Sequence, residues 1–163
     1  MFKIERIQRT HQTKLFDCGE PSLDEYLKRF ALKNDTNDIG RTFVAIEPEG
    51  PQVLGFYTIS AGAVRFDNFP PGIKLPKYPI PTVHIGRLAA DKTVQGQGLG
   101  EALLFDALRW SADVAEFVGI KAVELWALSE KARSFYLRYG FKELRDDRLH
   151  LYLSMETIRQ VIS

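Results

Sequence analysis

The stretch "VQGQGLGEALLFDALRWSA", Val94–Ala112, decides how this chain is interpreted. It places three alternate glycines, Gly96, Gly98 and Gly100, at the start of an apolar run with helical spacing. Glycine costs backbone entropy, so three within five residues need a reason. The first N–H groups of a helix have no internal partner, and the helix dipole is positive at that end. The glycines therefore predict a phosphate site made of backbone N–H groups. The alternative is a loop that only caps the helix.

Known phosphate-binding loops narrow the choice of ligand. No Lys-Ser or Lys-Thr pair follows the glycines, which excludes the P-loop. The dinucleotide fingerprint needs Gly or Ala in its last position, where this chain has Glu101 or Leu103, depending on the glycine from which one counts. The remaining pattern, over Gln95–Gly100, is Gln/Arg-x-x-Gly-x-Gly.

Length and composition set bounds on the class of protein. The 163 residues favour one domain, which we expect to span residues 1–163. A net charge of +1 argues against a strongly basic nucleic-acid binder. The single cysteine, Cys18, excludes an internal disulfide, and without a Cys/His cluster we expect no metal. We see no signal peptide and no apolar run long enough for a bilayer, so we expect a cytoplasmic protein without membrane contact.

Apolar periodicity and turn residues predict the order of elements. Helices are expected after Ser22 as N-cap, over Glu101–Val118 ending at Gly119, and from Ser129 as N-cap to Gly140. Five prolines make 67–81 an extended surface excursion. Strands are expected over 2–7, 41–46, 52–64, 82–90, 121–128 and in 141–155. The alternation of strands and helices in the second half implies a βαβ unit in a mixed sheet, with antiparallel strands before it.

Two segments, in this order, carry a family resemblance. "HIGRLAADKTVQGQGLGEALL", 84–104, resembles the strand, loop and helix that bind acyl-CoA in the GCN5-related N-acetyltransferases (GNAT). "ALSEKARSFYLRYGF", 127–141, resembles the segment that closes their site. The resemblance implies an α/β (α+β) GNAT fold, with a central mixed, mostly antiparallel twisted sheet flanked by helices. It also implies acetyl-CoA as acetyl donor.

The N-terminal half narrows the resemblance. "FDCGEPSLDEYL", "RTFVAI" and "LGFYTISAGAV" are similar to the GNAT toxins of type II toxin–antitoxin systems. Those toxins acetylate the α-amino group of aminoacyl-tRNA and are held by a ribbon-helix-helix antitoxin. The resemblance implies these two partners, and a homodimer. Trp126 stands where many such toxins have His, so the accepted amino acid stays open.

The resemblance also implies site residues. Tyr136 is the expected general acid, because a phenol pKa near 10 is close enough to that of a thiol to protonate the leaving sulfur. The alternative is an aromatic side chain that only packs, which is the role expected for Tyr139. Acetyl-CoA is expected to contact Phe135, the strand residues Leu88, Ala89 and Ala90, and the loop residues Gln95, Gly96, Gln97, Gly98, Leu99 and Gly100.

No His or Glu is identified from the sequence as a general base. This favours an α-amine as acceptor, because its pKa of about 7.7–8.0 leaves it partly neutral, whereas a lysine amine needs a base. A tRNA acceptor also needs phosphate contacts. The candidates, each equally consistent with a solvated surface, are Lys28, Arg29, Lys33, Arg41, Lys74, Lys77, Arg87 and Arg138.

Two other functions remain open from the sequence. The first is a GNAT enzyme that acetylates a small-molecule amine or a protein N-terminus. The second is a non-catalytic CoA-binding regulatory module, against which Tyr136 and the uninterrupted glycine loop argue. Inhibition of translation would separate the toxin from the first, and any acetyl transfer would exclude the second.

Overall fold

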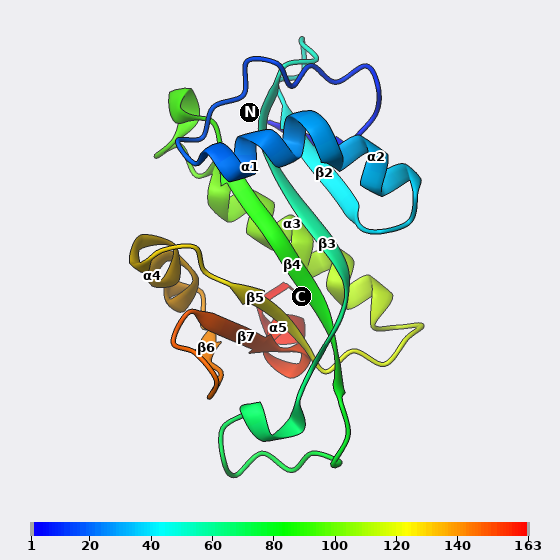
Figure 1. Cartoon of the computed structure of the whole chain (residues 1–163), viewed down its shortest axis with the longest axis vertical. Helices are drawn as coiled ribbons and strands as arrows, with labels where there is room; N and C mark the ends of the chain where they lie inside the picture. The colour runs from blue at the N-terminus through cyan, green and yellow to red at the C-terminus, as the bar shows by residue number, and fades with distance from the viewer. Residues whose placement is uncertain (1, 163) are drawn as a thin grey trace. The chain divides into compact units, whose positions relative to one another are not determined.

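A computed structural model of the chain describes residues 2–162 (Figure 1). Seven strands form one sheet in the order β1-β2-β3-β4-β5-β7-β6. The pairs β1–β2, β2–β3, β5–β7 and β6–β7 are antiparallel, whereas β4–β5 is parallel. The mixed, mostly antiparallel sheet with flanking helices confirms the expected fold class. The chain divides into two compact units, Met1–Ser60 with Gly86–Ala107, and Ala61–Ile85 with Leu108–Ser163.

The elements follow one another in the predicted order, most with shorter bounds, whereas β4 and α3 each begin two residues earlier than expected. The strands are β1 Lys3–Arg6, β2 Arg41–Ile46, β3 Val53–Val64, β4 Ile80–Ala90, β5 Ala122–Trp126, β6 Lys142–Glu143 and β7 His150–Ser154. The helices are α1 Pro21–Glu25, α2 Ala31–Thr36, α3 Leu99–Val114, α4 Glu130–Arg138 and α5 Met155–Ile162. A π-helical turn, Tyr26–Phe30, joins α1 to α2, and short 3₁₀ turns occupy Phe66–Asn68 and Lys92–Val94.

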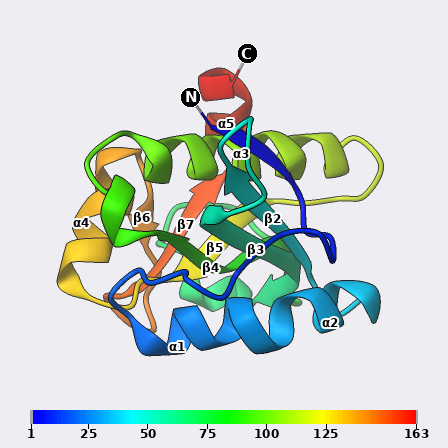
Figure 2. The ribbon, with the colours of Figure 1, turned by 90° about the horizontal axis from the view of Figure 1, so that it is seen from above.

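In the first unit, α1 and α2 lie on one face of β2 and β3, and the beginning of α3 lies on the other (Figure 2). Gly55 on β3 makes this close approach of α3 possible. A Cβ at Gly55 would lie 2.9 Å from Leu99 Cδ2 and 3.0 Å from Leu103 Cδ1. The buried Tyr57 hydroxyl donates to the Asp106 carboxylate of α3 at 2.6 Å. Packing and this hydrogen bond together fix the start of α3.

In the second unit, the proline-rich segment is attached to the sheet by apolar side chains. Phe69 packs edge-on against Tyr152 of β7, with ring centroids 5.1 Å apart. Phe69 and Ile80 belong to one buried cluster with Ala122 and Leu144. The excursion predicted over 67–81 is therefore confirmed up to its last residues, because β4 already begins at Ile80.

Three expected helix limits are wrong, including the start of α3, which lies at Leu99 rather than Glu101. Ser22 is not the N-cap: α1 begins at Pro21, after Glu20, because proline suits the first turn of a helix. Helix α3 ends at Val114 rather than before Gly119. The residues after Val114 find no core to bury them, since Phe117 is 90% exposed.

The expected limits of α4 are confirmed. The Ser129 hydroxyl accepts a hydrogen bond from the Ala132 N–H at 3.1 Å, as an N-cap does. Gly140, with φ 95°, follows the end of the helix. Glycine adopts this left-handed conformation at little cost, so Gly140 stops the helix where the sequence places it.

Candidate active site

The glycine loop before α3 has the geometry of an anion site. Gly96 and Gly98 have φ values of 85° and 82°, which residues with a Cβ rarely adopt. A Cβ at either position would meet nothing within 4 Å, so these glycines serve the backbone conformation rather than packing. Helix α3 begins at Leu99, and the N–H groups of its first turn have no partner within the helix. Two left-handed glycines exceed what a helix cap needs, which favours the phosphate site over the capping alternative.

Polar side chains of the first unit hold this loop in place. The buried Asp91 carboxylate accepts from the Thr93 N–H and hydroxyl and from the Asp17 N–H. Burial alone would raise the pKa of Asp91, but these hydrogen bonds outweigh it and lower that pKa. The Gln95 amide donates to the carbonyls of Ala90, at 3.0 Å, and of Cys18, at 3.2 Å. The Gln95 side chain therefore anchors the loop. The Gln97 N–H donates to the Val94 carbonyl at 3.3 Å, and the remaining N–H groups of the loop are the candidate ligand donors.

The expected strand residues, Leu88, Ala89 and Ala90, lie in the part of β4 that is no longer paired with β5. The ladder between these strands runs from Thr82↔Ala122 to Ile85↔Leu125, whereas β4 continues to Ala90. The backbone groups of 86–90 are thus not used in that ladder. Ala89 is buried in the core cluster of the first unit, so its methyl group packs in the core rather than contacting a ligand.

Tyr136 lies on α4 in the second unit and is 7% exposed. Its ring packs edge-on against Phe135, with centroids 5.1 Å apart, and against Phe141, at 5.4 Å. Burial raises the pKa of Tyr136 above its ordinary value of 10, which keeps the phenol protonated at neutral pH and makes it a weaker acid toward sulfur than a free phenol. A protonated hydroxyl is the form that a general acid requires. Phe135 also contacts the Tyr139 ring, at 5.1 Å.

The second unit also contains a chain of four titratable side chains that the sequence analysis missed. His84 Nδ1 lies 2.8 Å from Glu124 Oε1, and the other Glu124 oxygen contacts His150 Nε2. His150 Nδ1 lies 2.9 Å from Asp146 Oδ1. The available signal was Glu124, a charged residue within the otherwise apolar strand "AVELW". Its partners come from β4 and β7, so only the strand register shows that they meet.

The charges of this chain follow from its contacts. Burial alone would raise the pKa of Glu124, but hydrogen bonds with His150 and His84 lower it to about 2. Burial alone would lower the pKa of His150, but hydrogen bonds with Glu124 and Asp146 raise it. The buried Glu124 is therefore a carboxylate, and His150 between two carboxylates favours its protonated form. Trp126 stacks on the His150 ring, with centroids 4.1 Å apart and planes 9° apart.

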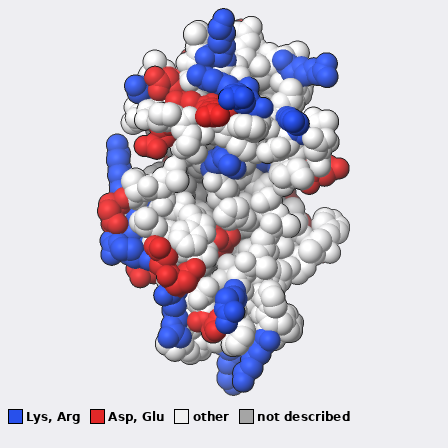
Figure 3. Space-filling model, viewed as in Figure 1, with Lys and Arg blue, Asp and Glu red and all other residues white. Residues whose placement is uncertain are grey.

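The basic candidates for tRNA contacts fall into two groups. The four arginines each have a neighbour: Arg29 pairs with Glu25, Arg41 with Asp38, Arg87 lies over the Tyr26 ring and Arg138 over the Phe135 ring. The four lysines are exposed and form no ion pair within residues 2–162: Lys28, Lys33, Lys74 and Lys77. On the face shown in Figure 3, basic and acidic side chains are interspersed.

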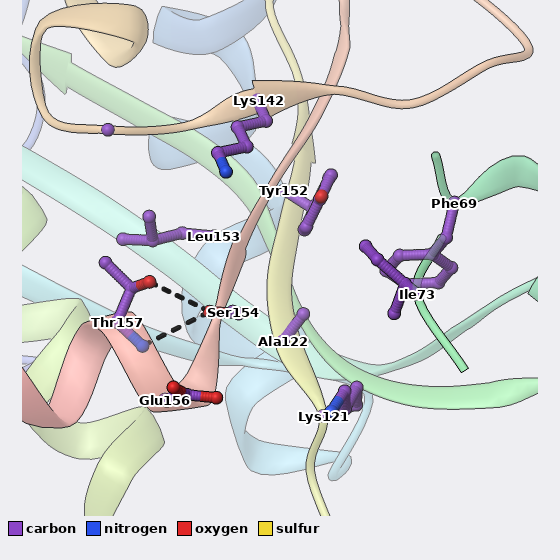
Figure 4. A pocket seen from close by; sticks show the side chains of 11 residues that line it. Phe69, Ile73, Lys121, Ala122, Lys142, Tyr152, Leu153, Ser154, Glu156 and Thr157 are labelled. Carbon is purple, nitrogen blue, oxygen red and sulfur yellow. Dashed lines mark hydrogen bonds between the residues drawn. The ribbon is translucent and has the colours of Figure 1, made fainter. Parts of the chain in front are cut away.

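A pocket of about 190 Å³ lies elsewhere in the second unit. Phe69, Ile73 and Tyr152 line it, and Lys142 and Ser154 add polar groups (Figure 4). None of the expected site residues lines this pocket. Across the described part of the chain, no group of three or more His, Cys, Asp or Glu could hold a metal ion. No described helix is long and apolar enough to cross a membrane.

Known proteins match the chain along most of its length. The acetyltransferase (GNAT) domain family matches residues 38–143. A tRNA-acetylating toxin of Mycobacterium tuberculosis is 37% identical over 159 residues, which cover 96% of this chain and 94% of the relative.

Two solved structures of the protein AtaT are similar as well. AtaT complexed with acetyl-methionyl-tRNAfMet matches with a TM-score of 0.92 and 30% identity, and covers 100% of both chains. An AtaT variant bound to acetyl-CoA and to the C-terminus of the antitoxin AtaR has a TM-score of 0.84 and 28% identity, and covers 99% of this chain and 97% of that one. Since the family match spans both the glycine loop and Tyr136, and a relative 37% identical extends the likeness to nearly the whole chain, this protein belongs to the GNAT acetyltransferase family.

Proposed function

We propose that this protein is an acetyl-CoA-dependent toxin that acetylates the α-amino group of aminoacyl-tRNA and so blocks translation. The observation that carries the proposal is likeness over the full chain. The tuberculosis relative is named a tRNA-acetylating toxin, and AtaT has been solved with an acetylated aminoacyl-tRNA. These matches cover nearly the whole chain, so the likeness to the toxins is not limited to the donor-binding segment.

The donor is acetyl-CoA, and the loop 95–100 supplies the groups for its phosphates. The first-turn N–H groups of α3 and the left-handed Gly96 and Gly98 offer donors without a charged side chain. The backbone of Leu88 and Ala90, outside the β4–β5 ladder, offers donors for the pantetheine arm and the acetyl oxygen. Preorganised donors of this kind contribute about 2.7–4 kcal/mol each to transition-state stabilisation.

Tyr136 protonates the leaving sulfur. The amine forms a bond to the thioester carbonyl carbon, the C–S bond breaks, and the sulfur takes the phenolic proton. The buried Tyr136 hydroxyl is protonated at neutral pH, as a general acid must be. Phe135, packed on the Tyr136 ring, fixes the ring position.

The acceptor tRNA and the protein partner complete the proposal. The exposed lysines Lys28, Lys33, Lys74 and Lys77 are stronger phosphate contacts than the arginines, which would have to leave their present neighbours. A ribbon-helix-helix antitoxin binds the toxin, as the antitoxin AtaR binds AtaT. The toxin itself forms a homodimer. Because charged tRNA is the substrate, the toxin acts in the cytoplasm.

Labelled acetyl-CoA tests this function directly. With charged tRNA, the label should appear on the α-amine of the esterified amino acid. Uncharged tRNA should stay unlabelled, and free amino acids should be poor acceptors, because they lack the phosphates that position the amine. Efficient labelling of small amines or protein N-termini, with charged tRNA untouched, would replace this function by the small-amine alternative.

A further inference from the structure

The chain from Asp146 to His84 leaves one ring nitrogen unused. His84 Nδ1 is taken by Glu124, whereas Nε2 has no hydrogen-bond partner within residues 2–162. The His84 side chain is 32% exposed, so part of the imidazole is accessible from solvent. His11, in the first unit, is the contrasting case. It is buried, its Nδ1 accepts from the Gln8 N–H, and its Nε2 contacts Glu5 at 2.9 Å.

The partners of His84 determine where its proton lies. Glu124 is a carboxylate and can only accept, so His84 Nδ1 carries the hydrogen of their bond. In the neutral imidazole, which has one N–H, this arrangement places the lone pair on His84 Nε2. Nδ1 and Nε2 of His150 likewise donate to Asp146 and Glu124, which keeps the Glu124 charge fixed. A carboxylate that orients an imidazole through Nδ1 is the arrangement of a histidine that accepts a proton at Nε2.

The position of His84 on β4 connects it to the proposed reaction. His84 and Ile85 form the last pairs of the ladder with β5, and β4 then continues into 86–90, the segment proposed to hold the donor. Strand β3 passes close to this part of β4, because Gly62 has no side chain. A Cβ at Gly62 would lie 3.1 Å from His84 Cβ and 2.8 Å from Thr82 Oγ1. Thr82 Oγ1 is buried without a partner within residues 2–162.

We propose that His84 accepts the proton that the α-amine loses during acetyl transfer, with Glu124 as the residue that positions it. The nitrogen lone pair forms the C–N bond, and the C–S electron pair leaves with sulfur. The N–H proton goes to His84 Nε2, while sulfur takes the proton of Tyr136. His84 then releases its proton to solvent and Tyr136 regains one, which returns both groups to their starting forms. This inference rests on the proposed function for the identity of the amine.

The competing explanation is an ion-pair network that only supports the fold. Buried ion pairs are weak evidence for stability, because desolvation offsets much of their attraction. Perturbed titratable groups gather at functional sites, but structural networks perturb them too. The experiment must therefore read out chemistry rather than folding.

The first comparison sets His84→Gln and His84→Ala against His11→Gln, which removes a buried histidine also paired with a glutamate. With acetyl-CoA saturating and charged tRNA varied, kcat of both His84 variants should fall about 10²-fold, a general-base contribution. KM and acetyl-CoA affinity should change by less than about twofold. Added imidazole should restore part of the rate of His84→Ala, and His11→Gln should keep the wild-type kcat.

The second comparison tests the positioning role of Glu124. Glu124→Gln should lower kcat about tenfold without changing KM, and imidazole should not rescue it. In a His84→Ala background, Glu124→Gln should cost nothing further, because the group that it positions is gone. Circular dichroism would establish that each variant is folded.

Several results would overturn the inference. A wild-type rate in both His84 variants would mean that the proton goes to water. A loss that imidazole does not restore, or an equal loss in His11→Gln, would make the network structural. If charged tRNA is no acceptor for the wild type, the proposed function fails instead. The same variants are then compared on an amino acid methyl ester, which carries the α-amine without RNA, so the two failures stay distinct.

Discussion

The glycine loop of the first unit and the His84–Glu124–His150 chain of the second are built in opposite ways. The loop presents backbone groups from six consecutive residues, 95–100, and its main determinants are the two left-handed glycines. The chain presents side chains from β4, β5 and β7, brought together by strand register. A site made of backbone depends on conformation and tolerates changes of side-chain chemistry. A site made of side chains depends on single atoms.

The largest effect is expected where one atom does the chemistry. Tyr136→Phe keeps the ring between Phe135 and Phe141 and deletes only the hydroxyl. Turnover should fall by about 10²–10⁴, the usual contribution of a general acid, with acetyl-CoA affinity unchanged. Tyr139→Phe, also in contact with Phe135, is the control and should be mild. A rate close to wild type in steady-state kinetics would assign Tyr136 to packing.

A substitution at a loop glycine should weaken acetyl-CoA binding because it changes both the backbone conformation and the charge of the loop. Gly98→Asp forces a side chain onto a residue with φ 82° and adds a negative charge where phosphates are proposed to bind. Acetyl-CoA affinity should fall by about tenfold or more in calorimetry, because the N-terminal end of a helix favours one anion and not two. Gly72→Asp is a matched control, since Gly72 has φ 98° and equally open surroundings on the proline-rich segment. An equal loss in both variants would point to general strain.

The side-chain network should show itself in the pH dependence of stability. The pKa of Glu124 is lowered from 4.5 to about 2, so its contribution is present above pH 4.5 and is lost as pH falls toward 2. The pKa of His150 is raised from 6.5, so its contribution is present below pH 6.5 and is lost as pH rises through the folded value. The network thus stabilises most between pH 4.5 and 6.5.

Urea unfolding across this range checks the prediction. In the window of greatest stabilisation, Glu124→Gln should lower the free energy of unfolding by about 1–3 kcal/mol, since it weakens hydrogen bonds to two histidines. The acid limb of the stability profile should flatten in this variant. If the acid limb of the Glu124→Gln profile stays as steep as that of the wild type, other carboxylates cause the acid limb.

The smallest effect is expected from a side chain inside the backbone site. Gln95→Ala removes the bonds to Ala90 and Cys18 but leaves every N–H group of the loop. Acetyl-CoA affinity should fall only about two- to fivefold, because the two lost hydrogen bonds are exposed and act on the ligand only through the loop. Gln97→Ala, at an exposed neighbouring position, should have no effect. A hundredfold loss in Gln95→Ala would show that the loop depends on side chains after all.

This contrast also explains what the sequence could predict. The glycine loop and the limits of α4 were predictable because each is a contiguous pattern with a local physical cause. The His84 chain was not, because its members lie far apart in the sequence and meet through two strand registers. Ser22 and the end of α3 were predicted wrongly, because local signals did not show that proline would start α1 or that Phe117 would lack a core.

The roles of the site residues and the single domain over 1–163 stay predictions. The absence of a recognisable base favoured an α-amine acceptor, but His84 is now a candidate base. The preference for an α-amine therefore rests on the relatives and no longer on that absence.

The hydrogen bond from Gln95 to the Cys18 carbonyl has a practical consequence. Cys18 is the one thiol of the sequence, and burial raises its pKa to about 11, so it is almost entirely protonated at neutral pH. Alkylating reagents attack the thiolate, so labelling of the closed molecule is slow. Any opening that frees the segment around Cys18 exposes the thiol and speeds labelling. The rate of Cys18 alkylation, measured by mass spectrometry, therefore reports how often the segment that bonds to Gln95 opens.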